Sequence, residues 1–159
     1  MAPVRRAATA AVTLLLLAGP VAAQSPALVL EGKVKQPQHW TLDDLKKMSA
    51  TNADVSFQGE HGVVTGHFTG VLLWALIEAA GGIDDSGRSA ELRHAIRVTA
   101  KDNYVVVTST GEIAPEFGAK AAIVAYQRDG KPLDDFRLIM PGDKRGGRNV
   151  RDVTSINIE

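Results

Sequence analysis

Apolar and polar residues alternate along this chain in short runs of the kind that form β-strands. Turn-forming residues separate the runs, and two pairs of runs read as hairpins, with turns at 59–62 and 101–103. We therefore expect a protein made mainly of strands. The predicted strands cover 28–34 (LVLEGKV), 54–58 (DVSFQ), 63–68 (VVTGHF), 95–99 (AIRVT), 104–108 (YVVVT), 121–126 (AAIVAY), 136–140 (FRLIM) and 153–158 (VTSINI).

Helical spacing of apolar residues occurs in two places. Thr41 is followed three residues later by Asp44, which predicts a capping box at the start of a short helix. A longer helix is expected from Val71 to a glycine C-cap at Gly81, and a short turn or helix within 110–117. Because strands outnumber helices and the two do not alternate regularly, the sequence indicates an α+β fold.

The first residues have the pattern of an export signal. Arg5 and Arg6 precede the apolar run 7–19, and the small residues 21–23 suit cleavage after Ala23. The run is shorter than the roughly twenty apolar residues that a membrane span needs. We expect a signal peptide at 1–23, export by the general secretory route, and a periplasmic or secreted mature protein without a membrane span.

We expect the remaining residues, 24–159, to form one domain. Their composition limits the kinds of partner that this domain can bind. Cleavage removes two of the 18 basic residues and none of the 18 acidic ones, which lowers the formal charge from zero to about −2. No overall positive field would attract nucleic acid, so we expect no nucleic-acid partner. The chain has no cysteine, which excludes disulfides, thiolate metal ligands and a cysteine nucleophile.

The segment 142–151 (GDKRGGRNVR) is the strongest candidate for a binding site. It places four cations and three glycines between two apolar runs, a composition suited to holding an anion such as a phosphate. A solvated basic turn would have the same composition, and that alternative stays open. The cations are Lys144, Arg145, Arg148 and Arg151.

No other motif in the chain indicates catalysis or metal binding. The four histidines include no pair at the helical i, i+4 spacing of a zinc site, so no metal site is predicted. His61 and His67 would share a face if they lay on one continuous strand. A nucleophile elbow, an HExxH motif and a phosphate-binding loop are all absent, so catalytic residues remain unassigned.

The order of several segments resembles the molybdopterin-binding domain of the sulfite oxidase family, in a small, secreted, single-domain form. The resemblance covers nearly all of 28–158. It implies a mixed α+β domain that holds the phosphate and pterin of a molybdenum cofactor in a cleft. The segments are LEGKV, TLDDLKKM, FTGVLLWALIEAAGG, KDNYVVVTS, AIVAYQRDGKPL, RLIMPGD and GGRNVRDVTSINI.

The resemblance also implies site residues and partners. Arg145 and Arg148 resemble the basic positions of a cofactor loop, with Arg151 close by, where guanidinium groups can hold a phosphate bidentately. His61 and His67 lie near the segment that faces the cofactor in the family. A redox partner protein is expected if the chain is an oxidoreductase.

One departure from the family pattern divides the functional hypotheses. Catalytic members bind molybdenum through a cysteine thiolate, and by spacing that position falls within 56–60, at Gln58 or Gly59. Neither residue is a soft sulfur ligand. Two hypotheses follow. The chain is a molybdopterin-dependent oxidoreductase, or one subunit of such an enzyme. Alternatively, it is a binding module that lost the metal ligand and now holds an anionic small molecule or a protein partner. A secreted structural domain with a basic surface loop is a third reading.

Overall fold

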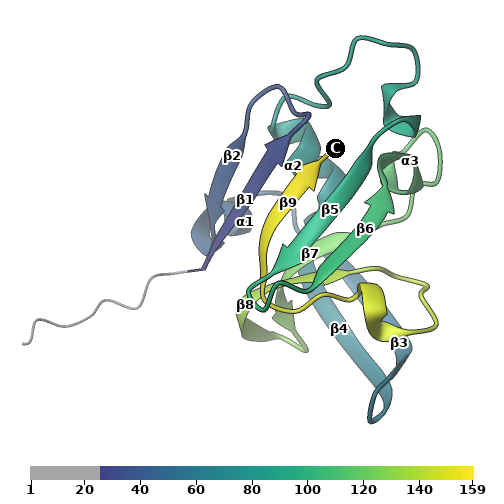
Figure 1. The fold of residues 1–159 in the computed structure, drawn as a ribbon. Helices are drawn as coiled ribbons and strands as arrows, with labels where there is room; N and C mark the ends of the chain where they lie inside the picture. The colour runs from purple at the N-terminus through teal and green to yellow at the C-terminus, as the bar shows by residue number, and fades with distance from the viewer. Residues whose placement is uncertain (1–25) are drawn as a thin grey trace, which may run out of the picture.

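The computed structural model describes residues 26–159, so the expected signal peptide at 1–23 lies outside the described residues. These residues form two β-sheets with short helices between and around them (Figure 1). The five-stranded sheet has the order β2-β1-β9-β5-β6 and comprises β1 (Ala27–Gly32), β2 (Gln38–Thr41), β5 (Ala95–Ala100), β6 (Val105–Ser109) and β9 (Val153–Ile158). The four-stranded sheet has the order β3-β4-β7-β8 and comprises β3 (Thr51–Gly59), β4 (Gly62–Leu72), β7 (Ile123–Arg128) and β8 (Lys131–Ile139).

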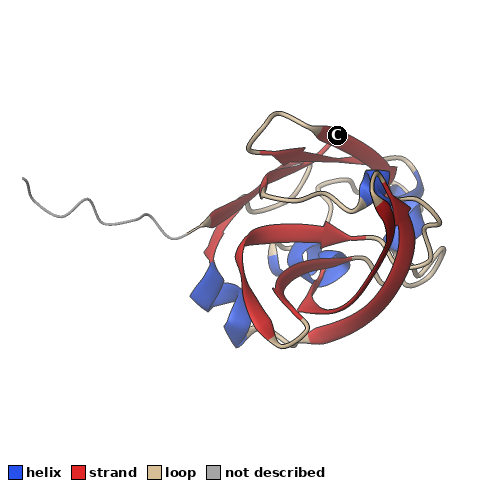
Figure 2. Cartoon of the chain, turned by 90° about the horizontal axis from the view of Figure 1, so that it is seen from below, coloured by secondary structure: helices blue, strands red, loops and turns tan. Residues whose placement is uncertain are grey.

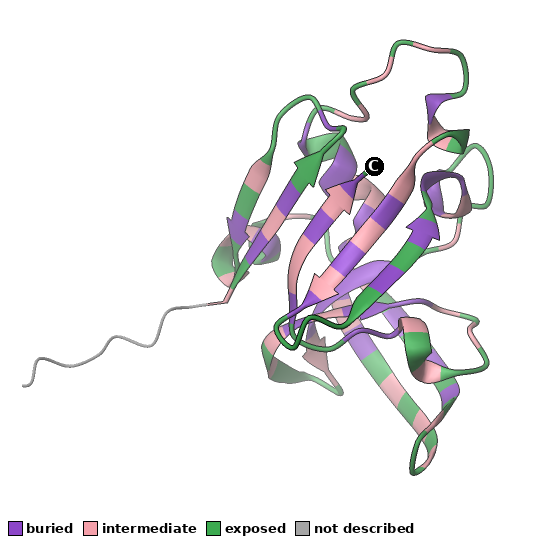
Figure 3. Ribbon diagram, in the orientation of Figure 1, coloured by how far each residue is buried: buried purple, intermediate pink, exposed green. Residues whose placement is uncertain are grey.

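The C-terminal strand β9 holds the five-stranded sheet together. It runs parallel to β1 on one side and antiparallel to β5 on the other. Buried and more exposed residues alternate along β5, where Ile96, Val98 and Ala100 face the core (Figure 3). One face of this sheet is therefore part of the core, as period-2 patterning requires.

The four-stranded sheet curls, as the view from below shows (Figure 2). Its strand β7 is buried on both faces: Val124 contributes to the main core, whereas Ile123 and Ala125 face the inside of the curl. A β-bulge interrupts β7 between Ala125 and Gln127. The apolar interior of the curl is a second cluster formed by Ala53, Val55, Phe57, Phe68, Ile123, Ala125 and Ile139.

The helices are short, and they begin where local sequence signals indicate. In α1 (Leu42–Lys47) the expected capping box is present, since Thr41 and Asp44 each accept a hydrogen bond from the other's backbone N–H. The helix α2 (Leu73–Ala79) starts two residues later than Val71, because β4 continues through Leu72. The other helical turns are α3 (Thr110–Ile113), η1 (Ala90–Leu92) and η2 (Gly146–Arg148).

Both expected hairpins are confirmed, as β3–β4 and β5–β6, but other elements differ from expectation. The short edge strand β2 and the turns η1 and η2 were not predicted, because three or four residues are too few for periodicity to show. Strand β8 begins at Lys131 instead of 136, since its first half lies in a hairpin with β7. Moreover, β8 and β9 belong to different sheets, so the basic segment between them crosses from one sheet to the other.

The main core lies between the two sheets and takes apolar side chains from both. It includes Leu28 and Ile156 from the five-stranded sheet and Val124 and Phe136 from the four-stranded sheet, all of them buried. No helix within residues 26–159 has the length and apolar character needed to cross a membrane.

Candidate anion-binding cleft

A cleft of about 950 Å³ opens at one end of the curled sheet. It lies between the β3–β4 hairpin, the β5–β6 turn and the segment 142–152, which we call the basic loop. The hairpin contributes the continuous stretch 57–64, and the turn contributes Asp102 and Tyr104. Three segments far apart in the sequence thus form one concave surface.

Basic side chains outnumber acidic ones in this cleft. Four arginines, Arg128, Arg137, Arg145 and Arg151, line it together with His61, against the acidic residues Glu60, Asp102 and Asp152. None of the ion pairs among the described residues includes Arg137, Arg145 or Arg151. A guanidinium without an acidic partner is free to hold a carboxylate or phosphate through two parallel hydrogen bonds.

The basic loop is anchored at several points. The backbone N–H of Gln58 donates to the carbonyl of Lys144 (2.9 Å), and the Tyr104 hydroxyl donates to the carbonyl of Gly147 (2.8 Å). At the loop's base the buried Asn149 accepts a hydrogen bond from the backbone N–H of Met140 through Oδ1 (2.8 Å). These contacts hold the loop against both the hairpin and the turn, so its cations are presented from a fixed backbone.

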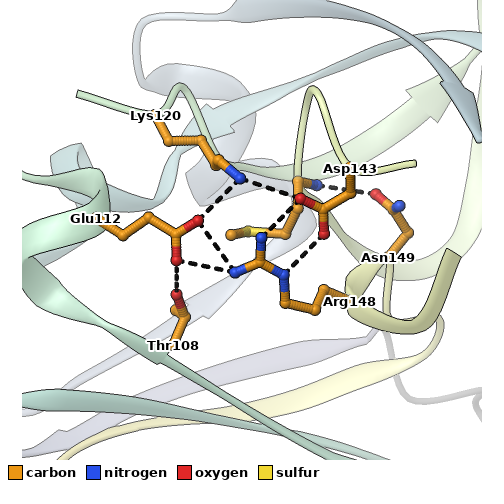
Figure 4. A network of polar contacts seen from close by, with 7 residues as sticks. Thr108, Glu112, Lys120, Asp143, Arg148 and Asn149 are labelled. Carbon is orange, nitrogen blue, oxygen red and sulfur yellow. Dashed lines mark hydrogen bonds and ion pairs between the residues drawn. The ribbon is translucent and has the colours of Figure 1, made fainter. Parts of the chain in front are cut away.

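Arg148 lies in a separate network of polar groups (Figure 4). Its guanidinium contacts Asp143 (2.6 Å) and Glu112 (2.8 Å), and Lys120 contacts the same two carboxylates. The hydrogen bonds that Arg148 donates to Asp143 and Glu112 raise the pKa of Arg148 above its usual range. The network ties the basic loop to α3 and to the segment ahead of β7.

The acidic members of this network stay ionised. Partial burial raises the pKa of Glu112, but hydrogen bonds from Arg148, Lys120 and Thr108 outweigh it and lower that pKa to about 2. The pKa of Asp143 is also lowered, chiefly by its hydrogen bonds from Arg148. With two cations facing two carboxylates, the network is balanced in charge.

The structure brings together three of the five residues proposed from the sequence. Arg145 and Arg151 line the cleft from the basic loop, and His61 lines it from the hairpin turn. Arg148 instead borders an adjacent shallow hollow of about 460 Å³ and is engaged by Glu112 and Asp143.

His67 points away from the other proposed residues. It pairs with Asp54 on β3, where its Nδ1 lies 2.8 Å from the Asp54 carboxylate, on the sheet face opposite to Phe68. His61 lies in the turn before β4, so the two histidines do not share one continuous strand. Direct contact of His67 or Arg148 with a ligand stays a prediction.

Sequence reasoning missed two cleft arginines, Arg128 on β7 and Arg137 on β8. The sequence does contain a sign of Arg137, because this arginine interrupts the apolar run FRLIM. Since alternate residues of a strand lie on the same face, Arg137 shares a face with Ile139. A cation on the buried face of a strand is unusual enough to mark a site. No comparable signal identifies Arg128, because the β-bulge that redirects it is not visible in the pattern.

The position expected for a metal-binding thiolate lies on the cleft wall. Gln58 and Gly59 both line the cleft, and Gln58 Nε2 donates to the carbonyl of Gly59 (3.1 Å). Within the described part of the chain, no three His, Asp or Glu side chains are grouped so that they could hold a metal ion. The cleft therefore suits an anion and offers no set of protein ligands for a metal.

Comparison with known proteins agrees with this arrangement. The family model described as the oxidoreductase molybdopterin binding domain matches residues 18–159, and the chain belongs to that family. The expected α+β molybdopterin-binding fold of the sulfite oxidase family is confirmed.

Among solved structures, the sulfane dehydrogenase SoxCD from Paracoccus pantotrophus is similar, with a TM-score of 0.68 and 16% sequence identity. The match covers 84% of this chain and 38% of that chain, so this chain spans well under half of the length of that protein. At this identity the likeness is one of fold. No curated protein matches the sequence.

Proposed function

We propose that this chain is an exported protein that holds the phosphate and pterin of a molybdenum cofactor in the cleft. The observation that carries the proposal is the convergence of arginines without acidic partners in the cleft of a molybdopterin-binding fold. Guanidinium groups match the geometry of a phosphate. Arg145 and Arg151 stand on an anchored loop, which favours binding, because little backbone freedom is lost when the ligand arrives.

Each cleft residue has a distinct part in this proposal. Arg145 and Arg151 are exposed on the basic loop and hold the phosphate, whereas His61 contributes from the hairpin turn. Gly147 leaves open space, since a Cβ there would meet only the Tyr104 hydroxyl at 3.8 Å, and this allows the ligand to approach the backbone. When bound, the cofactor supplies oxygen-atom transfer at its molybdenum.

The protein's own groups fit the organic part of this cofactor better than its metal. An amide at Gln58 or a hydrogen at Gly59 stands where the resemblance implies a thiolate, and the chain has no cysteine elsewhere. This observation favours a second candidate function: a non-catalytic module that binds the cofactor or another anionic molecule. If the chain is instead an oxidoreductase, it needs a redox partner protein to exchange electrons with its cofactor.

Metal and pterin content tests the proposal directly. Protein purified from its native export compartment is analysed for molybdenum and tungsten and, after oxidation, for pterin fluorescence. The expected result is pterin near one equivalent per chain, with a large loss in the Arg145→Gln/Arg151→Gln double variant. Arg97→Gln is the control, because Arg97 pairs with Glu159 away from the cleft. Absence of pterin from the unmodified protein would refute cofactor binding.

A cysteine substitution separates the two candidate functions. In Gln58→Cys, a thiolate is added to the cleft wall at the position that the resemblance implies. A gain of stoichiometric molybdenum in the variant would indicate a binding module that lost only its metal ligand. Stoichiometric molybdenum and turnover in the unmodified protein would indicate an oxidoreductase with unusual ligation.

A further inference from the structure

Strand β6 forms one edge of the five-stranded sheet, and among the strands of residues 26–159 it pairs with β5 alone (Figure 1). The N–H of Ala100 donates to the carbonyl of Tyr104 (2.9 Å), so the backbone of Tyr104 faces β5. Because backbone groups of successive residues point to opposite sides of a strand, the N–H and C=O groups of Val105 and Val107 point away from β5. No other backbone group in the described part of the chain bonds to them.

Exposed apolar side chains gather along this edge. Six large apolar side chains within residues 26–159 are exposed, and three of them, Tyr104, Val105 and Val107, lie on β6 or directly before it. A fourth, Leu92, lies beside Gly111, just beyond the end of β6. Val105 (40% exposed) and Val107 (50% exposed) are two residues apart, so both lie on the outer face of the sheet (Figure 3). Most of the exposed large apolar side chains thus lie beside unpaired backbone groups.

The other three sheet edges carry features that hinder pairing with another chain, whereas β6 carries none. Strand β8 exposes Lys131 and Pro132, and β3 exposes Asp54 and is hydrogen-bonded at its end to the basic loop. Strand β2 has only four residues. Charges, prolines, covering loops and short length are the usual means by which proteins block edge strands. The sequence of β6, VVVTS, has no charge, no proline and no bulge against β5, so its edge is open to another strand.

This edge is complementary to a copy of itself. When two copies of β6 run antiparallel about a two-fold axis at Val106, Val105 of one copy lies opposite Val107 of the other. The outward N–H and C=O groups of both valines then bond across the axis, and four exposed valine side chains pack together. An axis at Val107 would set Val105 opposite Ser109 and lose the valine contact, so the apolar pattern selects the axis at Val106.

We propose that this protein forms a symmetric dimer in which β6 of one copy pairs antiparallel with β6 of a second copy about Val106, joining the two five-stranded sheets into one. A second copy fits because the strand is uncharged. In this register Asp102, in the turn before β6, lies opposite Thr110 of the other copy, so no like charges meet. A single pair of strands is a small interface, so the dimer dissociates at micromolar concentrations. The inference goes beyond the proposed cofactor binding and does not depend on it.

Sedimentation equilibrium of the purified protein between about 5 and about 500 µM tests the dimer, with a dissociation constant expected in the range of tens of micromolar. Val107→Lys should weaken association at least about tenfold, because it places a charge on each side of the axis where apolar side chains meet. Val29→Lys is the matched control and should associate as the unmodified protein does. Val29 lies in the same row of the outer face as Val105, but on β1, which β9 and β5 separate from β6.

Disulfide formation tests the register, since the chain has no cysteine of its own. Val106→Cys should form an intermolecular disulfide with oxidised glutathione, because directly opposed residues of a non-hydrogen-bonded pair have Cα atoms about 4.5 Å apart, within reach of the bond. Val107→Cys is more exposed, but it lies diagonally from its counterpart, roughly 7–8 Å away, and should cross-link far more slowly.

Three results would count against the dimer. A protein that stays monomeric at about 500 µM would overturn the proposal and leave the edge for a strand of another protein. Equal weakening by Val29→Lys and Val107→Lys would place the contact on the face of the sheet instead of at its edge, which contradicts strand pairing. Faster cross-linking of Val107→Cys than of Val106→Cys would rule out the axis at Val106.

Discussion

Arginine has three different roles within a short distance in this molecule. Arg148 is neutralised by Glu112 and Asp143, Arg145 is exposed without an acidic partner, and Arg137 is partly buried against Phe68. The charge of each side chain is the same, so composition cannot separate these roles. What separates them is which carboxylates the fold brings within reach.

Glu112 leads to a prediction about acid stability. Its folded pKa of about 2 lies below the usual value of 4.5, so its ionised form stabilises the fold above about pH 4.5, and this contribution is lost as pH falls toward 2. Glu112→Gln should therefore lower stability by roughly 2 kcal/mol at neutral pH, the usual contribution of charged hydrogen bonds.

The measurement is urea unfolding of the unmodified chain and Glu112→Gln between pH 7 and pH 2. The difference in unfolding free energy should shrink toward zero at the acid end. Glu116→Gln, an exposed residue four positions away, is the control and should differ little from the unmodified chain at any pH. A difference that stays constant with pH would show that the ionised carboxylate of Glu112 is not what stabilises the network.

At the scale of elements, the cleft depends on how the basic loop is seated. The turn η2 packs directly against the end of β3: a Cβ added at Gly146 would lie 2.7 Å from the Phe57 ring. Hydrogen bonds from Gln58 and Tyr104 complete the contact. The loop therefore behaves as part of the wall of the curled sheet.

Neighbouring glycines in η2 test this seating. Gly146→Ala should displace the loop or the Phe57 ring, lower stability by about 1–3 kcal/mol and weaken ligand binding, as overpacking does. Gly147→Ala meets only an ordinary contact with Tyr104 at 3.8 Å and should leave stability nearly unchanged. Urea unfolding of the two variants provides the comparison, and equal stabilities would show that η2 is not held against β3.

At the scale of the whole molecule, the two sheets share one main core and should unfold together. Ile156 on β9 is fully buried and faces Leu30 and Val98 in register, while the same core contains Val124 and Phe136 of the other sheet. Ile156→Ala should cost about 2–5 kcal/mol. Ser155→Ala, on the other face of β9, is the matched control and should cost far less.

Tryptophan fluorescence and hydrogen exchange test whether the loss is shared. In a Trp74→Phe background the fluorescence comes from Trp40, which lies in β2 of the five-stranded sheet, and the amides of β7 report on the four-stranded sheet. In Ile156→Ala both signals should shift together, because neither sheet keeps its core without the other. Independent transitions would mean that the sheets are separately stable.

The hairpins β3–β4 and β5–β6, the capping box of α1 and the α+β class all follow from local pattern, because each depends on residues close together in the chain. The basic loop and its candidate cations Arg145 and Arg151 were also visible in the sequence. Segment order led to the family, and the absence of cysteine alone excluded a thiolate ligand.

Tertiary structure decided which cations meet and which are neutralised. It engaged Arg148 with Glu112, 36 residues away, and it brought Arg128 and Arg137 to the same ring through a register shift. It also separated β8 from β9 into different sheets, which made the basic loop a wall of the cleft. These outcomes depend on contacts between distant segments, and the periodicity of a single segment carries no information about them.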